Sequence, residues 1–329
     1  MSYRMRTILV TGVGAIIGYG IVRSLRASRF PVRIVGMDIN TDAVGQRWCD
    51  VFEEAVRADQ PEYGEHVAGL IRRHFVDLVI PGIEQDVHRL TADRLMAPLA
   101  EVNARFALNT PELIRIAGDK WLTHLELEKA GFPTIRTWID GNFHDLVKRS
   151  GCPLLMKPRR SYASKGIQRL ATEADYLYWK DKLGDEFMVQ EIVGDLQSEY
   201  TVGAFGLGDG SLVQQIAFQR VLSSDGSTAK ATVRSIPELE MRVEELARQF
   251  RPDGPTNFQF RFHRGEYLLL EINPRISSST SLRAAFGYNE AEMCVEYYLE
   301  GVIPQCRTLR AGSAARFIED WVAYAGDPR

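Results

Sequence analysis

Two neighbouring segments near the C-terminal end of the chain alternate between apolar and polar residues. In residues 257–263 a phenylalanine occupies every second position, and in residues 267–273 a leucine or isoleucine does. This period of two predicts two strands, each with one buried face. The short polar connection between them contains Gly265, which favours an antiparallel hairpin. The C-terminal half must therefore contain a sheet with one packed face and one polar face.

The length of the connection sets the register of this hairpin and decides which polar side chains meet. A three-residue connection, residues 264–266, pairs His263 with Tyr267, and counting back pairs Gln259 with Glu271. Leu268, Leu270 and Ile272 then share the buried face. The polar face carries three oxygen-bearing side chains, those of Gln259, Glu271 and Asn273. Such oxygens are ligands for a hard cation such as Mg²⁺, with Mn²⁺ as a substitute, whereas polar residues that merely face water are the alternative interpretation.

A lysine at the end of an apolar strand is the second feature with chemical content. Lys157 follows Pro153–Met156, where an unpaired ammonium group is costly to bury, so this lysine needs an anionic partner. The next residues form a loop rich in donors, among them Arg159, Ser164, Lys165 and the glycine Gly166. These residues are candidates for binding phosphate, and a basic surface loop is the alternative. Lys120 lies on a predicted helix, and the alternative interpretation is that its side chain simply faces solvent.

The N-terminal third predicts a different kind of sheet. Strands over residues 7–10 and 32–37 flank a glycine turn and a helix over residues 19–27. Strand and helix continue to alternate up to about residue 110, which is typical of a mostly parallel sheet. At Thr110 the pattern changes, because threonine can cap a helix that begins with the following proline. From about residue 152 short strands dominate, which predicts an α+β half.

The glycine turn, Gly12–Gly18, also permits a dinucleotide-binding interpretation. Asp38 follows Gly18 by 20 positions, near the place of the acid that holds a ribose hydroxyl in such folds. The glycine spacing is one residue too long for that motif, and close packing of a helix on a strand explains it equally well. An NAD(P)-dependent oxidoreductase is therefore kept as an alternative.

Composition and charge argue against several classes of protein. The chain has 40 Lys and Arg against 43 Asp and Glu. It therefore lacks the excess of basic residues that would indicate binding to nucleic acid. The apolar stretches are shorter than the roughly 20 residues that a membrane span needs. The four cysteines form no Cys-x-x-Cys pair, which argues against a disulfide framework or structural zinc. The start lacks a leader pattern, so we expect a cytoplasmic protein.

Taken in order, these segments resemble the ATP-grasp superfamily over most of the chain. The resemblance rests on Asp119–Trp121, Ala130–Thr134, Pro153–Arg159, Met188–Val193, Glu199–Val202 and Glu271–Arg275. The pattern is similar to a single half of the carbamoyl-phosphate synthetase large subunit, including the turn Thr11–Gly18 and the strand end Ile80–Glu84. That enzyme joins two such halves and has a second arginine where this chain has Ser278. A stand-alone carboxylate-amine ligase therefore fits better.

The resemblance implies a mixed α/β and α+β fold in which ATP lies between two α+β lobes. Residues 1–111 would form an N-terminal Rossmann-like domain with a parallel sheet, the pre-ATP-grasp domain. Residues 112–187 would form the small lobe of the ATP-grasp domain. Residues 188–329 would form its C-terminal lobe, which carries the metal and phosphate signature.

The resemblance also assigns roles to individual residues. Adenine would contact the hinge Gln190, Glu191, Ile192 and Val193, and the ribose would contact Glu199. The phosphates would contact Lys120, Lys157, Arg159, Ser164, Lys165 and Gly166. Mg²⁺ would be bound by Gln259, Glu271 and Asn273. Lys120, Lys157 and Arg275 would act catalytically by neutralising charge. The substrate contacts would be Glu84, Asp86 and Arg283, with surface positions as the alternative.

The reaction implied is the formation of an amide bond through an acyl phosphate, with ATP converted to ADP and phosphate. The partners would be a small-molecule carboxylate and an amine, amino acids among them, with a homodimer as the compatible assembly. A carbamoyl-phosphate-synthase-like subunit and a non-catalytic ATP-binding protein are the alternatives within the same fold.

Overall fold

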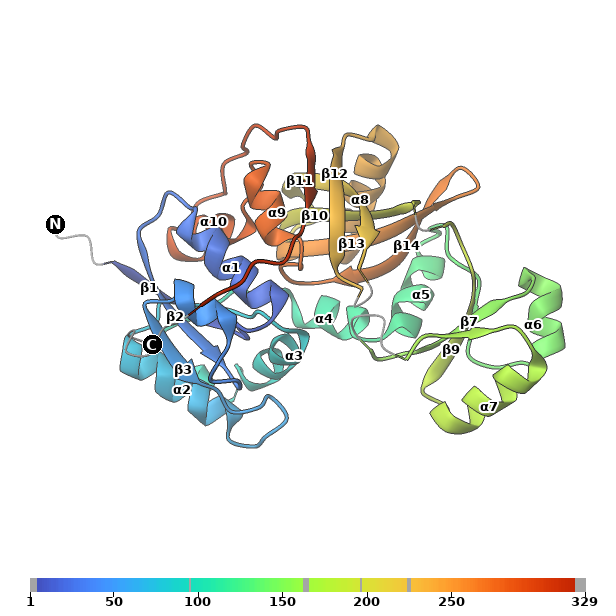
Figure 1. The fold of residues 1–329 in the computed structure, drawn as a ribbon, viewed down its shortest axis with the longest axis horizontal. Coiled ribbons are helices and arrows are strands. Elements are labelled where there is room, and N and C mark those ends of the chain that lie inside the picture. Colours follow the sequence, from blue (N-terminus) through green and yellow to red (C-terminus); the bar gives the residue numbers. More distant parts are fainter. Residues whose placement is uncertain (1–4, 95, 162–165, 196, 224–225, 323–329) are drawn as a thin grey trace.

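The computed structural model describes residues 5–94, 96–161, 166–195, 197–223 and 226–322. Figure 1 shows three sheets arranged along the long axis of the molecule: an N-terminal sheet at one end, a large sheet beside it, and a small sheet at the other end. Helices α4 (Pro111–Ala117) and α5 (Lys120–Lys129) lie between the N-terminal sheet and the small sheet. Within the described residues, every helix is too short or too polar to cross a membrane.

The N-terminal sheet is parallel, with the strand order β3-β2-β1-β4-β5. Its strands are β1 (Arg6–Thr11), β2 (Val32–Asp38), β3 (Val51–Glu54), β4 (Leu78–Ile80) and β5 (Arg105–Phe106). Its helices are α1 (Ile16–Arg26), α2 (Tyr63–His74) and α3 (Glu84–Asp93), with the short 3-10 turns η1 (Val44–Trp48) and η2 (Leu99–Glu101). The predicted parallel sheet is confirmed, although α1 begins three residues earlier than its pattern indicated.

The glycine turn allows α1 to pack closely on β1. A Cβ atom at Gly18 would lie 2.1 Å from the carbonyl oxygen of Gly12, a distance that no side chain can occupy. Asp38 is buried, and its carboxylate accepts hydrogen bonds from the backbone N–H of Gly14 at 2.7 Å and of Asn40 at 2.9 Å. The turn therefore serves helix packing, and its acid is already used within the protein, which removes the support for the oxidoreductase alternative.

Two caps start the connecting helices. The hydroxyl of Thr110 accepts a hydrogen bond from the backbone N–H of Leu113, as the Thr-Pro pattern predicted. Asp119 caps α5 and accepts from the backbone N–H of Trp121 at 3.0 Å. The second cap lies next to Lys120, so it fixes the direction in which that lysine leaves the helix.

The small sheet is four-stranded, in the order β6-β9-β7-β8. Its elements are β6 (Thr137–Trp138), α6 (Phe143–Ser150), β7 (Leu154–Pro158), β8 (Gln168–Leu170), α7 (Glu173–Leu183) and β9 (Phe187–Glu191). β9 pairs antiparallel with β7, and Leu155 lies opposite Gln190. A lobe boundary between residues 187 and 188 would cut this strand, so we propose that the small lobe ends after Gly194.

The large sheet has the strand order β14-β13-β10-β11-β12-β15. Its elements are β10 (Glu199–Leu207), β11 (Leu212–Leu222), β12 (Thr228–Arg234), α8 (Pro237–Phe250), β13 (Asp253–His263), β14 (Glu266–Asn273), α9 (Thr280–Ala285), α10 (Glu290–Cys294), the π-helix η3 (Val295–Leu299) and β15 (Ser313–Ala315). Ile21 of α1 and Phe218 of β11 belong to one buried cluster. The N-terminal sheet and the large sheet therefore share a core through α1, which fixes their relative position.

The hairpin β13–β14 reaches the predicted register by a different route. Its turn has two residues, Arg264 and Gly265, both with positive φ (50° and 88°), so His263 pairs with Glu266. The predicted three-residue connection is therefore wrong. A bulge after this turn adds one residue to β14, and beyond it Gln259 lies opposite Glu271 as expected.

The bulge also changes the faces of the leucines. Leu269 packs with Phe260 and Ile272 in the core, although the alternating pattern placed it on the polar face. Leu268 and Leu270 instead belong to a small cluster with Val193. The prediction that these two leucines share a face with Ile272 is wrong, because the inserted residue inverts the alternation.

Candidate active site

A pocket of about 900 Å³ lies where the small sheet, the large sheet and the N-terminal unit meet. We distinguish two ends of it by the elements that form them. The β9 end comprises Lys157, Gln190, Ile192, Val193 and Leu270, and the α3 end comprises Glu84, Gln85, His88 and Arg275. The metal-candidate residues Gln259, Glu271 and Asn273 line the same pocket.

Lys157 at the β9 end is half-buried beside a neutral partner. Its Nζ donates to Oε1 of Gln190 at 2.7 Å, and Gln190 in turn donates to the hydroxyl of Thr137 at 2.9 Å. Burial lowers the pKa of Lys157 to about 8, because the nearby carboxylates compensate the desolvation only in part. The amide thus holds the ammonium in position without neutralising it, and an anion entering the pocket would be strongly favoured.

Lys120 meets the pocket in the same way from α5. Its Nζ donates to the backbone carbonyl of Ser161 at 2.6 Å. Burial lowers the pKa of Lys120, while the charges of Glu271 and Glu84 raise it in part. The two lysines predicted to contact phosphate are therefore brought together, each with a neutral hydrogen-bond partner.

The remaining wall of the β9 end is apolar. Ile192 and Val193 follow β9, and Leu270 faces them from β14 because the bulge turns it toward this side. The residues predicted as the adenine hinge, 190–193, all line the pocket. Apolar walls of this kind suit a planar heterocyclic base.

Glu199 is buried between two arginines. Its carboxylate accepts from Arg220 at 2.7 Å and from Arg261 at 3.0 Å, and Arg261 also donates to the carbonyl of Val193 at 3.2 Å. Glu199 lines the pocket as predicted. Neither arginine was singled out from the sequence. The sequence did offer a way to find Arg220. It stands two places after Phe218 on β11, so strand alternation places both side chains on the same, buried face.

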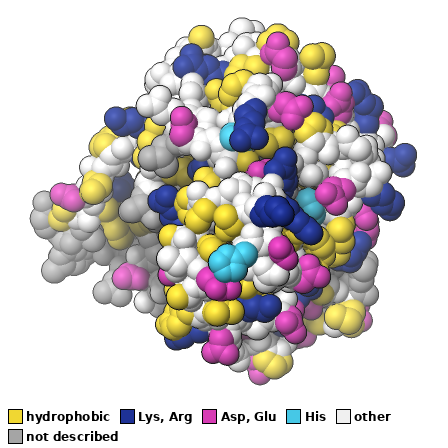
Figure 2. Space-filling model, turned by 90° about the vertical axis from the view of Figure 1, so that its right-hand side faces the viewer, with side chains coloured by type: hydrophobic (Ala, Val, Ile, Leu, Met, Phe, Trp, Pro, Cys, Tyr) yellow, Lys and Arg dark blue, Asp and Glu magenta, His cyan; other side chains and the backbone are white. Residues whose placement is uncertain are grey.

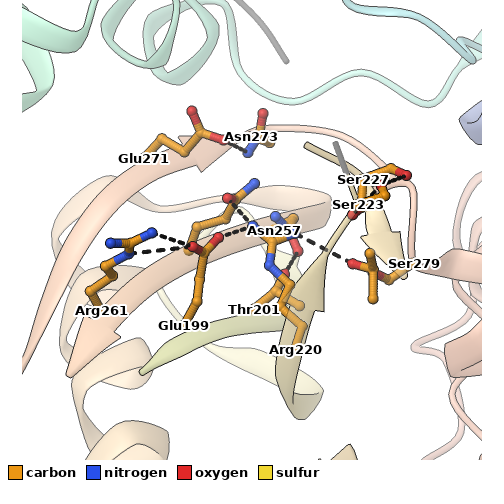
Figure 3. A network of polar contacts seen from close by, with 12 residues as sticks. Glu199, Thr201, Arg220, Ser223, Ser227, Asn257, Arg261, Glu271, Asn273 and Ser279 are labelled. Atoms are coloured by element: carbon orange, nitrogen blue, oxygen red, sulfur yellow. Dashed lines mark hydrogen bonds and ion pairs between the residues drawn. The ribbon is translucent and has the colours of Figure 1, made fainter. Parts of the chain in front are cut away.

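The three candidate metal ligands lie on one face of the hairpin: Figure 3 shows Glu271 next to Asn273 on β14, and Gln259 on β13 lies opposite Glu271. The amide of Asn273 donates to Glu271 at 3.1 Å, and its carbonyl oxygen accepts from Arg275 at 3.1 Å. The carbonyl oxygen of Gln259 accepts from Arg220. Among the described residues, Glu271 has no ion-pair partner. A carboxylate flanked by an amide fits a divalent cation that takes its other ligands from phosphate and water.

The α3 end is organised around a carboxylate that is already paired. Glu84 accepts from Arg275 and lies 3.4 Å from Nε2 of His88. Burial alone would raise the pKa of Glu84, but the charge of Arg275 and the hydrogen bond from His88 hold it at about 2. Glu84 is therefore an anion at any working pH. His88 was missed by sequence reasoning, although its spacing of four residues from Glu84 on one helix was a usable signal.

Two predicted substrate contacts, Asp86 and Arg283, do not line the pocket. Asp86 is buried against Thr11 and Tyr63, away from the pocket, and burial raises its pKa to about 6. Arg283 is 0% exposed and is held by Glu290 at 3.0 Å and Asn257 at 2.6 Å. Residues two positions apart on a helix point to opposite sides, so Asp86 points away from the side that carries Glu84. Arg283 lies inside the core of the protein and not on the surface of its helix.

The loop predicted over the phosphates is only partly within the structure. Ser164 and Lys165 lie outside the described residues. Arg159 does not line the pocket, because it pairs with the helix cap Asp119 at 2.7 Å. Gly166 is not among the lining residues either, whereas its neighbour Ile167 is. Arg159 therefore supports the start of α5 rather than a ligand.

Two sequence comparisons match this chain to known proteins. Residues 184–320 match the family described as ATP-grasp in the biosynthetic pathway with Ter operon. The carbamoyl phosphate synthase large chain of Methanosphaerula palustris is 23% identical over 299 aligned residues, which cover 83% of this chain and 27% of that protein. The chain thus spans about a quarter of the length of this curated relative.

Solved structures extend the match to nearly the whole chain. N5-carboxyaminoimidazole synthetase from Staphylococcus aureus, complexed with ADP, superimposes with a TM-score of 0.71 at 15% identity, covering 92% of this chain and 80% of that one. The biotin carboxylase β–γ-ATP complex from Campylobacter jejuni gives a TM-score of 0.72 at 15% identity, covering 94% and 74%. The chain has the ATP-grasp fold. The fold expected from the sequence is confirmed.

Proposed function

We propose that this protein is an ATP-dependent carboxylate-amine ligase that uses Mg²⁺. One observation carries the proposal: among the described residues, the half-buried Lys157 has only a neutral hydrogen-bond partner, and it lines the same pocket as Glu271, which forms no ion pair. Magnesium triphosphate satisfies both groups, because its phosphates take the ammonium and its metal takes the carboxylate.

The β9 end is the proposed nucleotide side. Adenine would lie against Ile192, Val193 and Leu270 and use the backbone of the hinge, and the ribose would lie near Glu199. Mg²⁺ would be held by Glu271, next to Asn273, and it would neutralise phosphate charge when bound. Lys120 and Lys157 would hold the phosphates in line with the α3 end.

The α3 end is the proposed substrate side. A substrate carboxylate oxygen attacks the γ-phosphorus, the bond to the β-phosphate oxygen breaks, and ADP leaves from an acyl phosphate. The amine nitrogen then attacks the acyl carbon, phosphate departs, and the amine proton is lost to solvent or base. Lys120, Lys157 and Arg275 would stabilise the transferring phosphoryl group by their fixed charge. Glu84 would orient the amine rather than the acid, because it is an anion.

The family match and the named relatives support this assignment at the level of the class. One superimposed structure contains ADP, and the other is an ATP complex. Because the curated relative is nearly four times longer than the matched region, the partner substrates are proposed here only as a small carboxylic acid and an amine.

A cytoplasmic location and a homodimer belong to the same proposal. Figure 2 shows acidic and basic side chains intermixed on one face, without a continuous basic patch there.

The proposal is tested by measuring ADP release with pooled small acids and amino acids, with and without hydroxylamine as an acyl-phosphate trap. We expect ADP and a hydroxamate with the parent protein and a loss of about 10²- to 10³-fold with Glu271→Ala. Glu266→Ala, on the exposed end of the same strand, is the matched control and keeps the parent rate. Nucleotide binding without ADP release would instead indicate a non-catalytic ATP-binding protein or a subunit that needs a partner.

A further inference from the structure

Arg220 lies in the wall of the pocket, next to the candidate metal residues. Its side chain is 5% exposed, and its guanidinium donates to Glu199 at 2.7 Å and to the carbonyl oxygen of Gln259. Its other terminal nitrogen lies 3.5 Å from the hydroxyl of Thr228. These contacts come from three different strands, so the guanidinium is fixed in one orientation.

The charges on the candidate metal residues are unevenly distributed. Only Glu271 is anionic, and its neighbour Asn273 is the amide in contact with it. Gln259 is neutral, and its oxygen already accepts from a guanidinium that stays protonated at all working pH values. A cation bound to Gln259 would have to displace Arg220 and then lie beside its positive charge.

Arg220 and Glu271 act on the same space. Burial lowers the pKa of Arg220, and the charges of Glu199 and Glu271 raise it again. Both side chains line the same pocket, so a triphosphate bound to a cation at Glu271 would also pass within reach of this guanidinium. If a second cation displaced the guanidinium of Arg220, this buried arginine would lose part of its hydrogen bonding, which is strongly unfavourable.

We propose that the site binds one divalent cation, at Glu271, and that the guanidinium of Arg220 occupies the place that a second cation would need beside Gln259. The proposal rests on the nucleotide site described above but not on the ligation reaction. Arg220 then supplies a fixed positive charge to the triphosphate, and this charge does not depend on the metal concentration.

The test is a Mn²⁺ titration of the full chain saturated with the non-hydrolysable analogue AMP-PNP, with free Mn²⁺ measured by electron paramagnetic resonance and a nucleotide-only blank. We expect one bound Mn²⁺ per chain for the parent protein. The double variant Arg220→Ala/Gln259→Glu removes the guanidinium and adds a carboxylate, so it should bind two. The single variant Gln259→Glu should still bind one, because Arg220 pairs with the new carboxylate.

Arg234→Ala is the matched control. Arg234 also donates to a glutamine, Gln219 at 3.0 Å, but on the exposed end of β12, so its removal should leave one bound Mn²⁺. Two Mn²⁺ of similar affinity in the parent protein would overturn the single-cation proposal, whatever the variants do. Calorimetric titration with AMP-PNP separates this result from a failure of the proposed function, in which the parent protein would bind no nucleotide.

Discussion

The two ends of the pocket treat charge in opposite ways. At the β9 end, Lys157 is a half-buried cation whose hydrogen-bond partner is a neutral amide. At the α3 end, Glu84 is an anion already paired with Arg275. The difference appears in the pKa values: burial brings Lys157 down to about 8, whereas the pairing holds Glu84 at about 2.

This contrast indicates which end awaits a charged ligand. A buried charge without a counter-ion is costly, and the cost is recovered when an ion of opposite sign binds. The β9 end therefore gains most from a polyanion. The α3 end gains little from a further cation at Glu84, so it is better suited to orienting a substrate than to providing most of the binding free energy.

The largest expected effect concerns Arg283, which lies in the core and therefore belongs to neither end of the pocket. Arg283→Met leaves Glu290 buried and unpaired, so we expect a loss of about 3–5 kcal/mol in the free energy of unfolding. Urea denaturation followed by circular dichroism measures it. The double variant Arg283→Met/Glu290→Met should recover most of the loss, because no lone charge remains. A single variant of normal stability with impaired substrate binding would return Arg283 to the α3 end.

The second prediction tests the cation at the β9 end directly. Lys157→Met should lower the rate of ADP formation by about 10²- to 10³-fold, since a positioned charge facing the phosphates is lost. Lys230→Met, at an exposed position on β12, is the matched control and should retain the parent rate. Equal rates in the two variants would show that Lys157 does not face the triphosphate.

The third prediction uses pH to separate the two ends. Because Lys157 has a pKa of about 8 in the free protein, its ammonium is lost above that pH. The dissociation constant for MgATP should therefore rise about tenfold per pH unit above about 8, one unit corresponding to about 1.4 kcal/mol. Isothermal titration between pH 6.5 and 9.5 measures it. In Lys157→Met the slope should vanish, and a slope that persists would point to another titrating group.

The sequence predicted the parts of the site that follow local rules. The cap at Thr110, the parallel N-terminal sheet and the pairing of Gln259 with Glu271 all depend on neighbouring residues or on strand alternation, whereas the second cap at Asp119 was not predicted. The hairpin reached that pairing only because a shorter turn and a bulge compensate each other, and no local pattern announces a bulge.

Side chains whose partners are distant in the chain could not be assigned from the sequence. Arg283 is 82 residues from Thr201 and 26 from Asn257, and these contacts put it in the core rather than on the substrate. Arg159 is used by a helix cap 40 residues earlier. A basic residue looks the same in the sequence whether its counter-charge is a ligand or another part of the protein.

The smallest expected effect distinguishes two acids that the sequence treated alike. Glu84→Gln should raise the Michaelis constant for the amine about three- to tenfold, the size of one ordinary hydrogen bond, and leave the affinity for MgATP unchanged. Asp86→Asn, two positions along the same helix, should change neither constant, because Asp86 faces Thr11 and Tyr63. It should instead stabilise the protein at pH 7, since burial raises the pKa of Asp86 to about 6 and an ionised carboxylate is then costly. If Glu84→Gln weakened the binding of MgATP and of the amine equally, the two ends of the pocket would not be functionally separate. The difference in charge between them would then not indicate which ligand each end binds.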